Sequence, residues 1–297
     1  MLGDRKIDLV KKLNDGNVTM VTSLFNQLPP ETVRALQDEA SEAGNLSFGG
    51  VIIPELNINF HVRRNEIRLL FDRRDMSATI VNAFMLMLQA RAHTRELAWF
   101  SRTGNKKDRK TGVSTYEPLA KHFCFSYSTS FRTIASFFQS LELINRNNLG
   151  LICIPIQYIT VDSQSTSRSF WAAIILDVAQ RKLYLVDVVR HCLLQQRLEL
   201  REQVAPLLES LGVAGLHFEP TSYAPALFCM DRALEITRAS EPDGFNPSRY
   251  ESGIYMMVAL YYIFSDTPIY FTENDVHNNN CIANKIIHWI KERGKIN

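Results

Sequence analysis

The stretch that decides the fold of this chain lies near its C-terminal end and reads Tyr250-Glu251-Ser252-Gly253-Ile254-Tyr255. It leads directly into an apolar segment, residues 254–264, which is far too short to span a bilayer. We therefore predict a buried helix over 254–264. Ser252 is expected at the N-cap or in the first turn of this helix, where a serine hydroxyl can accept a backbone N–H.

Three apolar segments upstream of this helix predict strands, at residues 151–156, 171–176 and 182–188. Near-continuous apolar runs of this length are typical of central strands that are covered on both faces. A long helical stretch over 192–211 and a proline-containing excursion over 219–247 follow. The predicted order is thus strand, turn, strand, long helix, loop and buried helix.

The first 50 residues have a different pattern of apolar residues from the rest of the chain. Their apolar residues recur near helical spacing, and Gly49-Gly50 closes the section. We expect residues 1–50 to form a helical N-terminal extension that packs on the main domain, residues 51–297. The alternative is that the extension is an arm that binds a partner.

The main domain is predicted to begin with strands and one helix. Residues 51–53 are strand-like, and the alternation of apolar and other residues over 67–71 favours a second strand. Asp75-Met76-Ser77 is expected to cap a helix that runs to about Ala92. The side chains predicted to face inward from this helix are Ile80, Val81, Phe84, Met85 and Leu88.

Composition limits the class of protein. A net charge of +2 leaves no strong field that would favour nucleic acid or a membrane surface, so neither partner is expected. The basic loop 102–112 is interpreted as an exposed connector, with a nuclear-targeting or phosphate-binding patch as the alternative. Five cysteines without a CxxC pair suit a reducing compartment and predict neither a metal site nor a cofactor. Without a signal-peptide core, the chain is expected to be intracellular, in the nucleus or cytoplasm.

In this order, the blocks of the chain resemble the SUMO-specific, Ulp-type cysteine proteases, the group related to adenovirus protease. The resemblance covers about residues 60–297 and rests on several blocks together. It implies an α+β fold of the papain-like, Ulp type, with a central mixed sheet of about five strands flanked by helices. The matching blocks are residues 80–85, 153–156, 169–177, 183–187, 246–253 and 272–276.

The resemblance also assigns catalytic positions, and most of them are changed here. Ser252 stands at the nucleophile position, Phe170 at the histidine position and Asn246 at the oxyanion glutamine position, while Asp187 matches the catalytic acid. A serine nucleophile needs a base more than a cysteine does, and a phenyl ring cannot accept a proton. Loss of the nucleophile or its base from a triad leaves only roughly 10³–10⁴-fold catalysis over water. We therefore expect a degenerate protease that is not an enzyme.

The resemblance places two further residues along the channel that holds a Gly-Gly tail in the family. Trp171 matches the tryptophan next to the histidine, whereas the second lid position falls near Asp75, which is not aromatic. Capture of a ubiquitin-like tail is therefore in question together with cleavage. The alternative for Trp171 is an ordinary core residue.

These observations predict a non-catalytic pseudoprotease that acts as a protein–protein interaction module or adaptor subunit in an intracellular complex. Residues 1–50 and 219–247 are the expected interfaces, because they depart most from the family. One alternative is a protein that binds SUMO or another ubiquitin-like modifier without cleaving it. Another is a serine hydrolase or acyltransferase, which would require His191 or another histidine within hydrogen-bond reach of Ser252.

Overall fold

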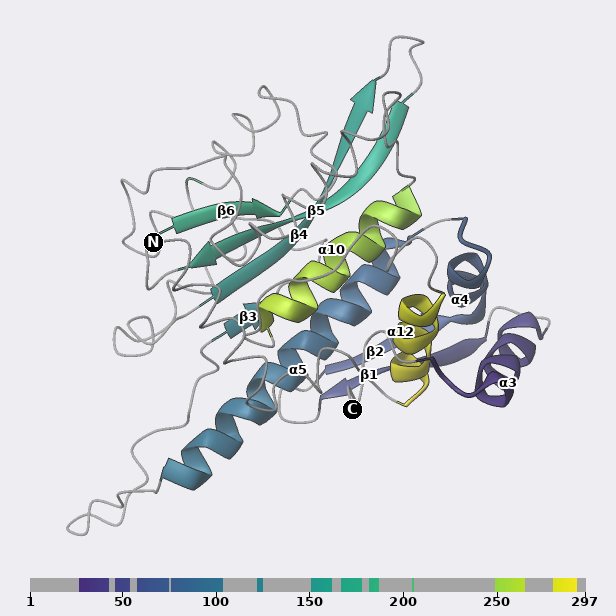
Figure 1. Ribbon diagram of the computed structural model, residues 1–297, viewed down its shortest axis with the longest axis horizontal. Coiled ribbons are helices and arrows are strands. Elements are labelled where there is room, and N and C mark those ends of the chain that lie inside the picture. The colour runs from purple at the N-terminus through teal and green to yellow at the C-terminus, as the bar shows by residue number, and fades with distance from the viewer. Residues whose placement is uncertain are drawn as a thin grey trace, which may run out of the picture.

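The computed structural model describes residues 27–42, 46–53, 58–74, 76–103, 122–124, 151–161, 167–177, 182–186, 205, 249–264 and 280–292. Its helices and strands form an α+β arrangement (Figure 1). In chain order they are α3 (Pro30–Ser41), β1 (Ser47–Ile53), β2 (Ile58–Arg63), α4 (Arg64–Phe71), α5 (Ala78–Thr103), β3 (His122–Cys124), β4 (Leu151–Val161), β5 (Ser167–Asp177), β6 (Lys182–Val186), α10 (Arg249–Phe264) and α12 (Cys281–Lys291).

The larger sheet is mixed, as the sequence predicts. Its strand order is β3-β4-β5-β6, with β3 parallel to β4 and the other pairs antiparallel. Within the described ranges it has four strands against the expected five or so, and β1 and β2 form a separate antiparallel pair. Residues 152–155 and 170–175 are buried without interruption, so both faces of β4 and β5 are covered there, as their apolar runs predict.

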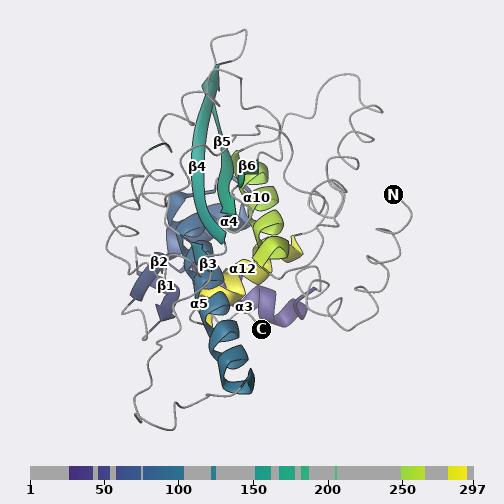
Figure 2. The same ribbon diagram turned by 90° about the vertical axis from the view of Figure 1, so that its left-hand side faces the viewer.

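Helix α10 lies at the centre of the molecule. It packs against β5 on one side and α5 on another, and its first turns approach the sheet in both views (Figures 1 and 2). Every residue from Ser252 to Phe264 is buried, and a helix that is apolar all round belongs inside a core. No helix among the described residues has the length and apolar character that a membrane crossing needs.

The predicted boundary at residue 50 is wrong in one respect, because β1 begins at Ser47 and contains both Gly49 and Gly50. These glycines allow close approach within the structure. A Cβ at Gly49 would lie 2.5 Å from the Ile290 carbonyl oxygen, and one at Gly50 would lie 2.0 Å from the Phe60 carbonyl oxygen. Helix α3 packs against α4 and α12, so this part of the N-terminal section belongs to the folded body.

The predicted strand over 67–71 is also wrong, since these residues end helix α4. Ile67 and Leu70, three positions apart, are fully buried, and this spacing is helical. The Glu66 carboxylate accepts the Arg63 backbone N–H at 3.2 Å, which satisfies a donor at the start of the helix. Leu69 and Phe71, which belong to the apolar alternation that favoured a strand, are only partly buried.

Helix α4 ends in a Schellman motif in which an arginine takes the glycine position. The Arg74 N–H bonds the Leu69 carbonyl at 3.0 Å and the Arg73 N–H bonds the Leu70 carbonyl at 3.2 Å. Arg73 has a φ of 53°, in the left-handed region that favours glycine. The left-handed backbone at Arg73 is therefore locally unfavourable. The side chain of Arg73 has a specific partner, described below.

The predicted helix after Ser77 is confirmed. The Ser77 hydroxyl accepts the Ile80 N–H at 3.3 Å, and all five residues predicted to face inward are buried. The helix, α5, runs on to Thr103, well beyond the predicted end at Ala92. Helix α10 begins at Arg249, which places Ser252 within its first turn and excludes the N-cap alternative.

Several expectations fall on residues that the structure does not describe. They include the excursion over 219–247, the helix over 192–211 apart from Ala205, and nearly all of the basic loop 102–112. Asp75, Asp187 and Asn246 also lie outside the described residues.

Candidate functional site

The two positions that the sequence places at a degenerate catalytic centre come together in the structure. The backbone N–H of Trp171, in β5, donates a hydrogen bond of 3.0 Å to Oγ of Ser252, in the first turn of α10. This nitrogen belongs to the peptide bond between Phe170 and Trp171. The Ser252 hydroxyl oxygen therefore lies directly against the backbone of the predicted histidine position.

Sheet pairing shows where this N–H lies in the sheet. The described part of β6 pairs with β5 from Asp177 back to Ala173, where its partner is Val186. Trp171 lies two residues beyond that pair, so the described part of β6 does not cover the edge of β5 there. The first turn of α10 reaches this edge and supplies the serine hydroxyl as acceptor.

Gly253 makes this close approach of α10 possible. A Cβ at this position would lie 2.5 Å from Met76 Cγ and 3.1 Å from Trp171 Cδ1, and the first of these distances is too short for a real contact. The absence of a side chain at residue 253 is therefore required for the helix to pack at this depth. Gly253 thus helps to bring Ser252 within reach of β5.

Trp171 joins a third element to the same cluster. Its indole Nε1–H donates a 2.9 Å hydrogen bond to the backbone carbonyl of Met76, which precedes α5. Both residues are fully buried. Trp171 is therefore placed in the core, with its one polar atom satisfied by the chain segment that adjoins the predicted second lid position.

The chemistry of the cluster is that of a closed, apolar core. Phe170 is buried and lies opposite Tyr158 in β4, and its ring carries no atom that could take a proton. Ser252 has no exposed surface. As an acceptor from a backbone N–H, its hydroxyl oxygen is engaged in a structural hydrogen bond.

Burial raises the pKa of two ionisable groups in the described core, Cys153 and Tyr250. Burial raises the pKa of the Cys153 thiol far above its ordinary value of 9.0, so this cysteine is no thiolate nucleophile at neutral pH. Burial also raises the pKa of Tyr250 to about 12, although the charge of Arg73 opposes that rise. Among the described residues, no three His, Cys, Asp or Glu side chains gather where they could hold a metal ion.

The histidines that the structure describes lie on other elements. His61 is exposed in β2 with its Nδ1 3.5 Å from Ser47 Oγ, and His288 is half-buried in α12. His191, the residue on which the hydrolase alternative depends, lies outside the described ranges.

Sequence reasoning did not foresee the role of Met76, which it used only as part of a helix cap. Met76 acts here through a backbone carbonyl and through close packing on residue 253, and a backbone acceptor leaves no signature in a sequence. Gly253, directly after Ser252, was the one signal in the sequence that α10 packs closely against its neighbours at this point.

The fold is that of the Ulp-type SUMO proteases, as the sequence resemblance predicts. The chain matches the C-terminal Ulp1 protease domain in complex with Smt3, the yeast orthologue of SUMO. The TM-score is 0.56 at 15% identity, over 90% of this chain and 97% of that one.

Two further structures of the SUMO protease Ulp1 match equally well. Their catalytic cysteine is oxidised to a sulfonic acid in one and to a sulfenic acid in the other, and both match with a TM-score of 0.56 at 15% identity. They cover 92% of this chain and 100% and 99% of their own. No known family of sequences and no curated protein matches the chain.

Proposed function

We propose that this chain is a catalytically inactive relative of the Ulp-type proteases that serves as a protein–protein interaction module or adaptor subunit in an intracellular complex. The observation that carries the proposal is the buried Ser252 hydroxyl, bound by the Trp171 N–H with a phenylalanine at residue 170. A hydrolase of this type needs an exposed nucleophile and a proton acceptor beside it. Phe170 supplies no acceptor, and Ser252 is not exposed.

Inactivity is tested on the full chain with fluorogenic SUMO–aminomethylcoumarin and ubiquitin–aminomethylcoumarin. We expect no release of the fluorophore above buffer. Release that disappears in Ser252→Ala would make the chain a serine hydrolase and refute the proposal. Release that persists in Ser252→Ala would also refute inactivity, unless a mock purification shows the same release.

The Phe170→His/Ser252→Cys double variant tests why the chain is inactive. If these two positions account for the loss, the double variant should release fluorophore faster than wild type and either single variant should not. The comparison works only where the double variant keeps the wild-type circular dichroism spectrum, since both positions are buried.

The adaptor role is tested by affinity purification of the tagged full chain from its own cells, followed by mass spectrometry. A stable, stoichiometric set of partners is expected. Truncation of residues 1–26 spares α3 and β1 and would show whether that section makes the contact. Recovery of no protein in constant ratio to the chain would contradict the adaptor role.

A second candidate function is binding of a ubiquitin-like modifier without cleavage. It is favoured by the structural match to a Ulp1 domain that is in complex with Smt3. Titration of the chain with SUMO in a calorimeter tests it, with an unrelated protein of similar size as the control. Saturable heat with SUMO alone would place this function ahead of the adaptor role.

A further inference from the structure

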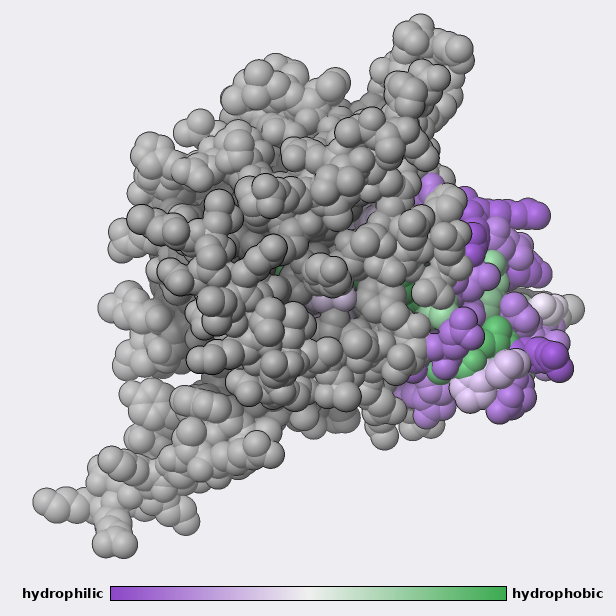
Figure 3. All heavy atoms as spheres, viewed as in Figure 1, coloured by the Kyte–Doolittle hydropathy of each residue, from purple (hydrophilic) through white to green (hydrophobic). Residues whose placement is uncertain are grey.

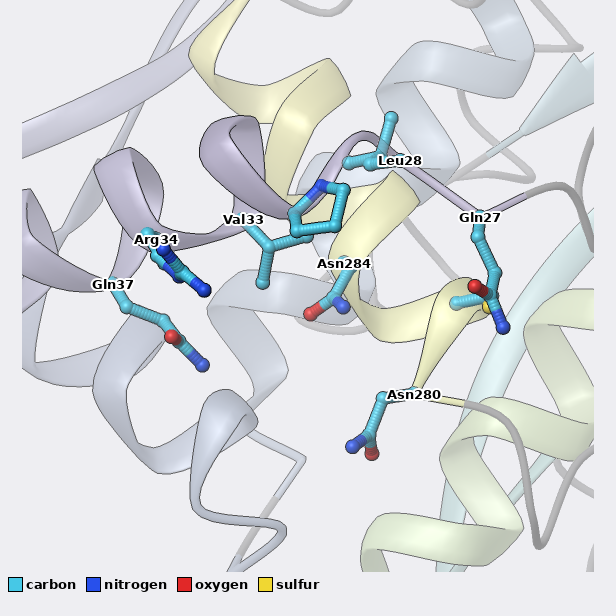
Figure 4. Close-up of a pocket in the computed structure, with 9 residues that line it drawn as sticks. Gln27, Leu28, Val33, Arg34, Gln37, Asn280 and Asn284 are labelled. Carbon is cyan, nitrogen blue, oxygen red and sulfur yellow. The ribbon is translucent and has the colours of Figure 1, made fainter.

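A groove of about 430 Å³ lies between α3 and the start of α12, apart from the Ser252 cluster. Arg34 and Gln37 reach into it from α3, while Asn284 faces them from α12 and Asn280 from the position before that helix (Figure 4). Its volume falls within the range of about 300–1,000 Å³ that is usual for ligand sites. The groove belongs to the part of the molecule where the described surface is largely hydrophilic, over α3 and α4 (Figure 3).

The charge of the groove is one-sided. Among the residues that the structure describes, nine line the groove, and they include one cation, Arg34, and no acid. Burial raises the pKa of the Cys281 thiol and the charge of Lys285 opposes that rise, which puts a second cation close to the wall. Glu31, in the first turn of α3, does not line the groove. An anionic ligand therefore fits it better than a neutral or cationic one.

Hydrogen-bond donors also prevail in the groove. Arg73 donates its Nε–H to Oδ1 of Asn280 at 2.7 Å, so the Asn280 amide N–H₂ is turned away from that contact. Helices α3 and α12 both begin at the groove without a side-chain cap, which adds the partial positive charge of their N-terminal ends.

The remaining lining residues suit a segment of polypeptide. Four of them carry side-chain amides, each with one acceptor oxygen and an N–H₂ donor that complement the groups of a peptide bond. Leu28, Pro30 and Val33 add apolar surface on the same wall. A groove with these properties can bind a main chain through its amides and a side-chain carboxylate through Arg34.

We propose that the groove between α3 and α12 binds an acidic, extended segment of a partner protein, with Arg34 pairing with an aspartate or glutamate carboxylate of that segment. The proposal rests on the interaction role above for the nature of the occupant. It does not depend on whether Ser252 is inactive.

The test uses the full chain and two fluorescein-labelled octapeptide pools in fluorescence anisotropy. One pool has glutamate at alternate positions with neutral residues between, and the other has lysine in place of glutamate. We expect saturable binding of the glutamate pool alone, weakened about ten-fold or more by Arg34→Glu, because a charge-assisted hydrogen bond is lost and repulsion replaces it. Asn284→Leu is expected to weaken binding several-fold through loss of an amide.

The matched control is Arg68→Glu, an exposed arginine of α4 that does not line the groove and undergoes the same charge change. It should bind the glutamate pool within about two-fold of wild type. Equal losses in Arg34→Glu and Arg68→Glu would mean attraction by overall charge and would overturn the proposal, as would absence of binding by the glutamate pool. Full competition by free glutarate at the peptide concentration would also overturn it, in favour of a small dicarboxylate.

Failure here is separable from failure of the proposed function. Absence of peptide binding together with absence of fluorophore release would remove the groove proposal and leave inactivity standing. Fluorophore release together with groove-dependent peptide binding would refute inactivity and leave the groove proposal standing.

Discussion

The backbone N–H of Trp171 and the side chain of Ser252 are joined by a 3.0 Å hydrogen bond across 81 positions of sequence. It ties the edge of β5 to the first turn of α10, the two elements that carry a catalytic pair in the proteases that this fold resembles. In this chain the same meeting point is a buried backbone-to-hydroxyl contact. Its consequences for stability can be measured without any assumption about catalysis.

Ser252→Ala should lower the free energy of unfolding by about 1–3 kcal/mol, because the buried Trp171 N–H loses the Ser252 acceptor. Urea denaturation followed by circular dichroism measures this. The matched control is Ser41→Ala, which removes an exposed hydroxyl bonded to the Gln37 carbonyl and should change stability by less than about 0.5 kcal/mol. Equal effects of the two substitutions would show that the Ser252 hydrogen bond contributes nothing specific.

Gly253→Ala should destabilise the protein by about 1–3 kcal/mol, although alanine is the better helix former by about 1 kcal/mol. The new Cβ would lie 2.5 Å from Met76 Cγ and 2.9 Å from Met76 Cβ, and the second of these atoms cannot swing away. A double-mutant cycle with Met76→Ala isolates this clash. The two changes should be less damaging together than the sum of each alone, and strict additivity would contradict the proposed contact.

Arg73→Gly should be more stable than Arg73→Ala by about 1 kcal/mol. Both variants lose the hydrogen bond to Asn280, but only glycine removes the cost of the left-handed backbone at φ 53°. Thermal denaturation of the pair measures the difference. The same two substitutions at Arg68, inside α4, should rank the other way, because glycine is the poorer residue in a helix. The same ranking at both positions would refute the backbone explanation.

The free energy of unfolding should decrease as the pH is raised above about 9. Burial raises the pKa of Cys153 above its ordinary 9.0 and that of Tyr250 from 10.0 to about 12. Each group holds its proton more tightly in the folded chain, so its contribution is complete below the ordinary value and is lost as pH rises toward the folded one.

For Tyr250 the loss amounts to roughly 3 kcal/mol over two pKa units. Urea denaturation of Tyr250→Phe and wild type at a series of pH values tests the sign. The two slopes should coincide below pH 9, and above about pH 10 the variant should lose stability less steeply. Parallel curves throughout would show that Tyr250 does not titrate with a raised pKa.

The sequence alone determined the main sheet and its covering helix, because their signals are strong and local. Long apolar runs over 151–156 and 171–176 lie within β4 and β5, and the apolar stretch after Ser252 lies within α10. The spacing of these blocks also carried the Ulp-type resemblance, which the structural matches support at the level of the fold. Short segments carried weaker signals. The apolar residues over 67–71 fit both the two-residue period of a strand and the spacing of a helix. Burial of Ile67 and Leu70 in the core favours the helix.

Only the tertiary structure decided which groups meet at the site. The sequence named Ser252, Phe170 and Trp171, but not that the Trp171 N–H would bond the serine or that its indole would bond the Met76 carbonyl. Backbone donors and acceptors are identical at every residue, so a sequence cannot say which of them meet. The groove between α3 and α12 is of the same kind, because Arg34 and Asn284 are 250 positions apart and become neighbours only through packing.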